Sequence, residues 1–267
     1  MRTEGPATAS GPEEGDPVAR LKALDTCAVS DALDKLGLNG AVAGITELAT
    51  RRRIAGRILT VKLGVGEPPP GKPRHVSTEA IEAARPGDII VVEQHSGVRA
   101  ASWGGILSLG AKIRGVAGAI ADGPVRDIDE SRQLDFPVFG TGVTMVTARG
   151  RIVELASGGP ITIRGVQVKP GDYAIADGSG VVLVAAENIE RVLATAENIF
   201  AREAAMAQAL REGKPITEVM GANNENMLKT RGKIPCPTEI RKLYEPASSI
   251  LRRSAMRSTG SVLPGNA

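Results

Sequence analysis

The chain has 267 residues, 42% of them hydrophobic and only 2% aromatic, so we expect one or two domains with a core of small aliphatic side chains. The net charge of +3 is uneven, because the residues from Asn223 onward hold eight basic and three acidic side chains, which leaves the remainder slightly acidic. This balance argues against nucleic acid as a partner of the main body, and no apolar run approaches the ~20 residues that span a membrane.

The two ends of the chain differ in composition from its centre. Residues 1–16 are rich in Gly, Pro, Glu and Ser and contain no apolar signal segment, so they are predicted to form a disordered leader. Residues 17–222 are predicted to form one domain, and residues 223–267 a basic, partly flexible extension. Cys27 and Cys236 lack the spacing of a metal site, which is typical of reduced thiols in a cytoplasmic protein.

Apolar periodicity alternates between helix and strand along the predicted domain, which favours an α/β fold with a layered β-sheet core flanked by helices. Helices are predicted over residues 18–24, 31–36, 76–84, 108–114, 128–134, 188–211 and 215–220. Strands are predicted over residues 54–63, 89–93, 116–121 and 137–140, and over a β-rich block, 161–185, that two turns divide. Residues 141–157 are predicted to be a polar loop or a hairpin. Ser30 is interpreted as a helix N-cap, with a Ser30–Asp31 ligand pair as the alternative.

The glycine pair Gly104–Gly105 directly precedes one of these helices. The backbone N–H groups of Gly105, Ile106 and Leu107 would then open the helix without an intrahelical acceptor, and the helix dipole would favour an anion there. The sequence therefore predicts a cradle for a carboxylate at this point.

Arg126 and Asp127 follow the turn that ends the next predicted strand. A carboxylate such as Asp127 suits Mg²⁺ or Mn²⁺, and the planar fork of Arg126 matches a carboxylate or an enolate oxygen. Together with the glycine cradle, the pair suits a small α-keto acid bound near a metal ion. The alternative interpretation is a surface ion pair that caps the following helix.

Several common sites are missing from the sequence. There is no G-x-G-x-x-G after a strand, no G-x-x-x-x-G-K-[ST] and no G-x-S-x-G, and the chain has only two histidines. His75 is interpreted as an ordinary surface residue in a loop. His95 lies at the end of a predicted strand and is a candidate for contact with a ligand.

The segments WGGIL, AKIRGVAGAIADGPVRD and FPVFGTG resemble the RraA-like family, as do SDALDKLGLNG and PGDYAIADGSGVVLV. This family includes regulators of ribonuclease E activity and 4-hydroxy-4-methyl-2-oxoglutarate aldolases. The resemblance implies a swivelling-type α/β/β fold in a homotrimer or hexamer with inter-subunit active sites. It also implies a class II aldolase: a lyase that uses Mg²⁺ or Mn²⁺, releases pyruvate and also decarboxylates oxaloacetate.

The resemblance also implies roles for individual residues. Asp127 matches the metal ligand, Arg126 the arginine that holds the keto and enolate oxygens, and residues 104–107 the backbone cradle for the pyruvyl carboxylate. Glu203 matches an acidic residue that reaches the metal waters of a neighbouring subunit, and His95 is a further candidate close to the metal.

One position departs from the family pattern. The aldolases commonly have W/F-G-[DE]-L, with the acidic residue near the metal, whereas this chain has Gly105 there. Glu93, Gln94 or His95 is our candidate for the missing acid. The alternative function is a non-enzymatic regulator that binds and inhibits an endoribonuclease complex, although such members tend to lose the aspartate that this chain keeps as Asp127. An older methyltransferase label for the family lacks support, because no glycine-rich cofactor loop follows a strand.

Overall fold

The computed structural model describes residues 15–68, 70 and 75–221. The chain divides into two compact units, residues 1–199 and 200–267. The predicted leader lies almost wholly outside the described residues, and the predicted basic extension lies entirely outside them.

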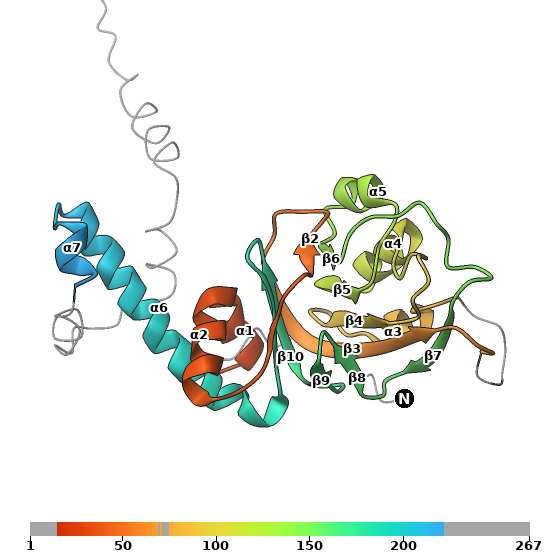
Figure 1. Cartoon of the computed structure of the whole chain (residues 1–267), viewed down its shortest axis with the longest axis horizontal. Helices are drawn as coiled ribbons and strands as arrows, with labels where there is room; N and C mark the ends of the chain where they lie inside the picture. Colours follow the sequence, from red (N-terminus) through yellow and green to blue (C-terminus); the bar gives the residue numbers. More distant parts are fainter. Residues whose placement is uncertain (1–14, 69, 71–74, 222–267) are drawn as a thin grey trace, which may run out of the picture. The chain divides into compact units, whose positions relative to one another are not determined.

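The first unit is a mixed α/β structure built on one nine-stranded sheet (Figure 1). Its strands follow the order β1-β11-β10-β3-β4-β5-β6-β2, and β7 pairs with β3 beyond the end of β10. The pairs β3–β4, β4–β5 and β5–β6 are parallel, and the others are antiparallel. The strands are β1 (Ala41–Val42), β2 (Thr46–Glu47), β3 (Ile54–Gly64), β4 (Ile89–Gln94), β5 (Gly118–Asp122), β6 (Val138–Gly140), β7 (Val153–Ser157), β10 (Tyr173–Asp177) and β11 (Gly180–Val184). A separate hairpin consists of β8 (Ile161–Ile163) and β9 (Val166–Val168).

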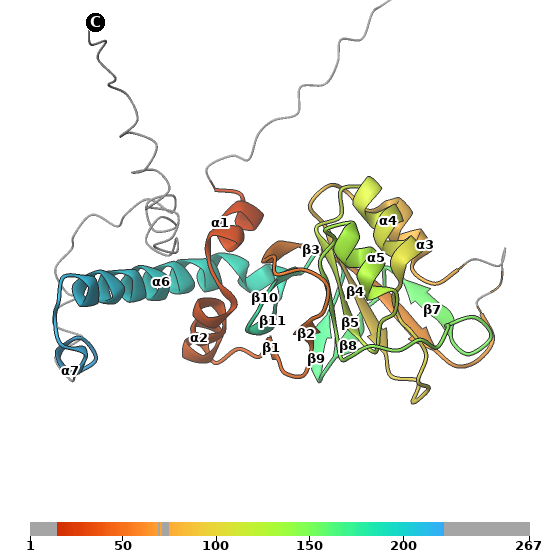
Figure 2. The same ribbon diagram turned by 90° about the horizontal axis from the view of Figure 1, so that it is seen from above.

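The central strands bury side chains on both faces, as parallel strands covered on both sides do. In β4, Ile90 and Val92 belong to one apolar cluster, and Ile89 and Val91 belong to another. The first cluster is covered by α3 (Thr78–Ala83), α4 (Gly105–Ile113) and α5 (Ile128–Gln133), and the second by the β8–β9 hairpin (Figure 2). The expected layered α/β fold is confirmed.

The N-terminal helices are α1 (Pro17–Ala23) and α2 (Thr26–Leu36). Gly37 ends α2 in the left-handed conformation, as predicted. The prediction that Ser30 caps this helix was wrong, because Asp25 accepts a hydrogen bond from Ala28 N at 2.8 Å. Asp177 accepts another from Thr26 N at 3.1 Å, so the helix begins one turn earlier.

Two further differences arise in the β-rich part. The predicted loop or hairpin over residues 141–157 instead contains β7, which pairs antiparallel with β3. The block over residues 161–185 contains a third turn, at Arg164–Gly165, where both φ angles are positive (48° and 87°). Such angles are typical of a tight hairpin turn, but an arginine in that conformation is not expected from sequence.

The helix α6 (Ile189–Arg211) begins in the first unit and ends in the second. Within the described part of the second unit, Gly213 ends this helix with φ 87°, and α7 (Ile216–Val219) follows Pro215. No helix among the described residues is both long enough and apolar enough to cross a membrane.

Candidate active site

The two halves of the predicted site lie side by side, although 22 residues separate Gly105 from Asp127. An isolated parallel bridge joins Trp103 to Val125, and Arg126 N donates a hydrogen bond to Trp103 O at 3.0 Å. These contacts hold the start of α4 against the segment that follows β5. The helix opens at Gly105, as predicted.

Asp127 connects the two halves. Its backbone is left-handed, with φ 57° and ψ 42°, and its side chain does not cap α5, the helix that it precedes. Instead, Oδ2 accepts a hydrogen bond from Gly105 N at 3.1 Å, and Arg126 Nε lies 3.0 Å from Oδ1 and 3.1 Å from Oδ2. The Asp127 side chain is 27% exposed and that of Arg126 is 37% exposed, so both are accessible to a ligand.

The predicted N–H cradle is therefore smaller than expected. The Gly105 N–H is already bonded to Asp127, which leaves the N–H groups of Ile106 and Leu107 without an acceptor among the described residues. Two such groups at the positive end of a helix dipole still favour a carboxylate. The anion site and the aspartate thus share one helix start.

Close packing explains both glycines. A Cβ atom on Gly104 would lie 2.9 Å from Asp127 Oδ2 and 3.2 Å from Arg126 Cγ. A Cβ atom on Gly105 would collide with Glu130 Oε2, and it would lie 3.1 Å from Asp127 Cβ. Any other residue at these positions would displace the acidic or basic groups of the site.

Glu130 is the residue of this site that the sequence analysis missed. It lies on α5, three positions after Asp127, and its carboxylate occupies the space beside Gly105 where a side chain would otherwise begin. This short spacing from Asp127 is the only signal for Glu130 in the sequence. No hydrogen bond or ion pair to the Glu130 carboxylate is found among the described residues.

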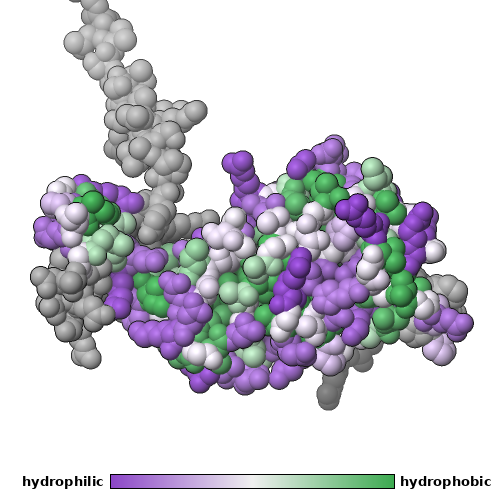
Figure 3. Space-filling view, in the orientation of Figure 1, coloured by the Kyte–Doolittle hydropathy of each residue, from purple (hydrophilic) through white to green (hydrophobic). Residues whose placement is uncertain are grey.

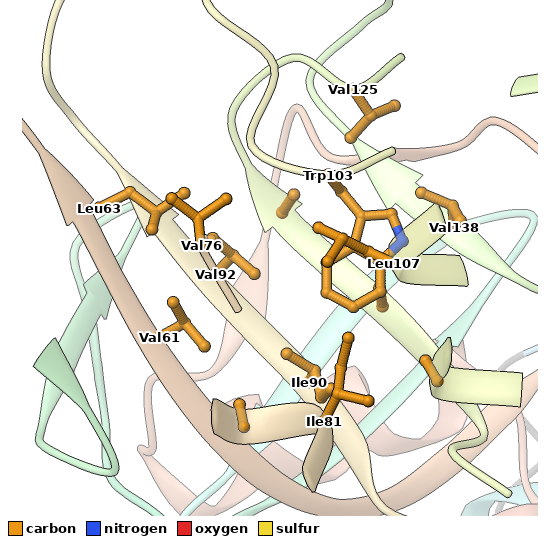
Figure 4. Packing of buried hydrophobic residues seen from close by; sticks show 14 of the residues in the cluster. Val61, Leu63, Val76, Ile81, Ile90, Val92, Trp103, Leu107, Val125 and Val138 are labelled. Carbon is orange, nitrogen blue, oxygen red and sulfur yellow. The ribbon is translucent and has the colours of Figure 1, made fainter. Parts of the chain in front are cut away.

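Buried hydroxyl groups connect α4 to Trp103 and to α5. Trp103 Nε1 donates to Ser108 Oγ at 3.0 Å, and Ser108 Oγ lies 2.9 Å from Ser131 Oγ on α5. Trp103 also stacks on Phe136 with a centroid separation of 6.3 Å. Trp103 and Leu107 belong to the same buried apolar cluster (Figure 4). Hydrogen-bonded hydroxyls between packed helices fix the relative positions of Gly105 and Asp127.

His75 is an exposed loop residue, as predicted, but it lies near other basic side chains. Burial lowers the pKa of His75, and the positive charges of Arg149 and Arg126 lower it further. Three basic side chains therefore lie within electrostatic reach of one another beside the candidate site. This grouping could not be predicted from sequence, because the three residues lie on separate segments.

The candidates for a compensating acid have other partners. Glu93 accepts from Thr162 N at 2.6 Å and forms an ion pair with Lys62, and Gln94 donates to the carbonyls of Val98 and Ala100. His95 Nε2 lies 2.6 Å from Asp122 Oδ2. No hydrogen bond joins these three residues to Arg126 or Asp127 within the described chain.

Glu203 is exposed on the part of α6 that belongs to the second unit. The site lies in the first unit, so its role toward a metal remains a prediction.

The donor set of the site is compatible with a hard cation. No group of three or more His, Cys, Asp or Glu side chains that could hold a metal ion occurs in the described residues. Asp127 and Glu130 nevertheless offer two carboxylates that both lie against the backbone of Gly105, and Mg²⁺ commonly binds through one or two carboxylates and keeps several waters. The residues present therefore fit Mg²⁺ or Mn²⁺ and do not resemble a closed structural metal site.

Comparisons with known proteins agree with this fold. The sequence profile of the RraA-like family, described as Aldolase/RraA, matches residues 26–183. "Protein DlpA" from Legionella pneumophila is 27% identical over 71% of this chain, which spans only 31% of that protein. A Halalkalibacterium halodurans protein named "Putative 4-hydroxy-4-methyl-2-oxoglutarate aldolase" is 30% identical, over 74% of this chain and 90% of its own length.

A solved structure is also similar. RraAS2 from Streptomyces coelicolor, described as an unusual member of the RNase ES inhibitor RraA protein family, superposes with a TM-score of 0.59 at 25% identity. The match covers 68% of this chain and 92% of that structure.

Proposed function

Because this chain belongs to the RraA-like (Aldolase/RraA) family, we propose that it is a divalent-metal-dependent lyase of the class II pyruvate aldolase type. Its substrate would be a 4-hydroxy-2-oxo acid such as 4-hydroxy-4-methyl-2-oxoglutarate, and its product pyruvate. Relatives that carry this aldolase name support the proposal. The observation that carries it is the hydrogen bond from Gly105 N to Asp127 Oδ2, because it joins an anion cradle to a metal-type carboxylate.

Different groups of the chain would bind the substrate carboxylate, its keto oxygen and the metal ion. The N–H groups of Ile106 and Leu107 would hold the substrate carboxylate, and the fork of Arg126 would stabilise negative charge on the adjacent keto oxygen. Asp127 and Glu130 would hold Mg²⁺ or Mn²⁺, which supplies Lewis-acid chemistry when bound.

The proposed reaction is a retro-aldol cleavage. A water at the site accepts the proton of the C4 hydroxyl, the C3–C4 bond breaks, and C4 becomes the keto carbon of one pyruvate. The electron pair stays on C3 as the enolate of a second pyruvate, where the proton returns. Oxaloacetate would lose CO₂ to give the same enolate, which accounts for decarboxylase activity as a side reaction.

We also propose that the active form is a homotrimer or a hexamer with active sites between subunits. Ile106, Leu109 and Ile113 recur on one face of α4 and are 80%, 41% and 76% exposed. Figure 3 shows apolar surface where Figure 1 has α4 and α5. An apolar stripe of this kind, beginning in the first turn of the site helix, suits contact with another subunit.

The test measures pyruvate release from 4-hydroxy-4-methyl-2-oxoglutarate and oxaloacetate with MgCl₂ or MnCl₂. Asp127→Asn should lower kcat/KM at least about a hundredfold, because the amide is a poor metal ligand. Asparagine tolerates the left-handed backbone at this position, so the fold should persist.

The matched control is Asp129→Asn, which changes an exposed acid in the same helical turn that pairs with Arg132 at 2.8 Å. This variant should keep the wild-type rate. Equal rates for wild type and Asp127→Asn on both substrates would refute the proposed function.

The second candidate is a regulator that binds and inhibits an endoribonuclease complex, and the name printed for the Streptomyces relative favours it. A regulator would slow RNA cleavage by the purified endoribonuclease, and Asp127→Asn would leave that inhibition intact. Keto-acid cleavage without any effect on RNA cleavage would exclude this alternative.

A further inference from the structure

We infer that Glu130 supplies the second acidic group at the metal position of Asp127, across the gap left by the missing side chain of Gly105. This inference rests on the proposed function and deepens it by naming a second acidic residue of the metal site. Gly105 and Glu130 would then be a matched pair, in which the absence of one side chain makes room for the carboxylate of the other.

The first observation is steric. A Cβ atom on Gly105 would collide with Glu130 Oε2 and lie 2.9 Å from Glu130 Cδ, so the carboxylate packs directly against the glycine backbone. The same Cβ atom would lie 3.1 Å from Asp127 Cβ. Because Asp127 Oδ2 accepts a hydrogen bond from Gly105 N, both carboxylates lie against the backbone of Gly105 at the start of α4.

The second observation concerns hydrogen bonding. Asp127 has Gly105 N and Arg126 Nε as donors. Glu130 has no hydrogen-bond donor or cationic partner within the described chain, although Asp129 beside it pairs with Arg132. Arg126 pairs with Asp127, and no ion pair found among the described residues balances the charge of Glu130 beside it, so the two carboxylates repel each other and a divalent cation would remove that repulsion.

Contacts between α5 and α4 hold Glu130 near Gly105. Asp127 directly precedes α5 and Glu130 lies in its first turn, so both acids belong to the N-terminal end of that helix. Ser131, next to Glu130, is fixed to Ser108 of α4 at 2.9 Å, which limits movement of one helix against the other. The gap between Glu130 and Gly105 is thus held by packing and does not depend on a surface loop.

The experiment titrates the full chain with MnCl₂ and follows free Mn²⁺ by electron paramagnetic resonance. Glu130→Gln should weaken Mn²⁺ binding about tenfold or more, the loss typical of groups that support a metal ligand. Asp129→Asn is the matched control and should bind as the wild type does. The rise in Tm on adding Mn²⁺ should shrink for Glu130→Gln, while the Tm in EDTA should stay unchanged.

A transplant variant tests the pairing itself. Gly105→Asp combined with Glu130→Ala moves the carboxylate from α5 to α4 within the same volume, and it should regain most of the Mn²⁺ affinity that Glu130→Ala loses. Rescue of this kind is not expected if Glu130 only stabilises α5.

The outcomes separate this inference from the proposed function. Loss of Mn²⁺ binding in Asp127→Asn with wild-type binding in Glu130→Gln would overturn the role of Glu130 and leave the lyase proposal intact. Wild-type Mn²⁺ binding in both variants would overturn both. A gain in Mn²⁺ affinity for Glu130→Gln would also overturn the inference, because it would mean that the carboxylate obstructs the site.

Discussion

Two groups of carboxylates lie at or after the C-terminal ends of the parallel strands β4 and β5, and they differ in how fully they are paired. Asp122 is 4% exposed and is bound by His95, by Arg164 Nε at 2.9 Å and by Arg164 N at 3.1 Å. Glu93 is 5% exposed and bound by Thr162 N and Lys62. Asp127 and Glu130, by contrast, are accessible, and Glu130 has no partner in the described chain.

The difference separates acids with a structural role from the acids that we propose to bind a ligand. A buried carboxylate must have its hydrogen bonds satisfied, and here Asp122 and Glu93 fasten the β8–β9 hairpin to the ends of β4 and β5. An accessible pair that faces a common volume has bonding capacity to spare, which a ligand can use. Asp122 and Glu93, whose hydrogen bonds are satisfied, stabilise the fold, and Asp127 and Glu130 are left able to bind a ligand.

Among tests of this contrast between paired and accessible acids, the largest effect is expected for Asp122→Ala. The substitution removes the acceptor of Arg164 N and of two basic side chains, so the free energy of unfolding should fall by about 3 kcal/mol. Urea unfolding measures the loss, and the folded fraction should keep its Mn²⁺ affinity. An unchanged free energy of unfolding in Asp122→Ala would contradict a structural role for this acid.

Arg126→Lys is expected to have the next largest effect, on catalysis and not on folding. Lysine keeps the charge but loses the planar fork, so we expect kcat to fall about tenfold while the free energy of unfolding changes little. Steady-state kinetics and thermal unfolding check the two parts. An unchanged kcat would mean that Arg126 acts only as a counter-charge to Asp127.

Ser108→Ala tests the hydroxyl network that joins α4 to α5. It leaves Trp103 Nε1 without its acceptor and Ser131 without a partner on α4, so a loss of about 1 kcal/mol in the free energy of unfolding is expected. A modest rise in KM should accompany it if the network positions Gly105. Ser131→Ala serves as the companion variant, because it breaks the same link from the other helix.

The smallest expected effect concerns His75. Its folded-state pKa lies below the ordinary value near 6.5, so the unfolded chain binds the proton more readily. This residue therefore contributes stability above pH 6.5 that is lost as the pH falls through that value toward the folded-state pKa. His75→Gln should flatten the pH dependence of the urea midpoint in this window, and an equal slope in both proteins would contradict the shift.

Much of the fold could be predicted because its signals are local. The alternating clusters of β4, the left-handed stop at Gly37 and the helix start at Gly105 all follow from periodicity or from the properties of glycine. The pairing of β7 and the turn at Arg164 could not be predicted in this way, because each depends on a partner distant in sequence. The start of α2 has a local signal in Asp25, and Thr26 is also held by the distant Asp177.

By itself, the sequence determined the fold class, the family and the two halves of the candidate site: Gly104 to Leu107, and Arg126 with Asp127. Only the tertiary structure decided that Asp127 uses the Gly105 N–H and that Glu130 lies against the same glycine. The physical reason is that both contacts cross between α4 and the segment after β5. The space beside Gly105 could be assigned to Glu130 only from the packing of α5 against α4.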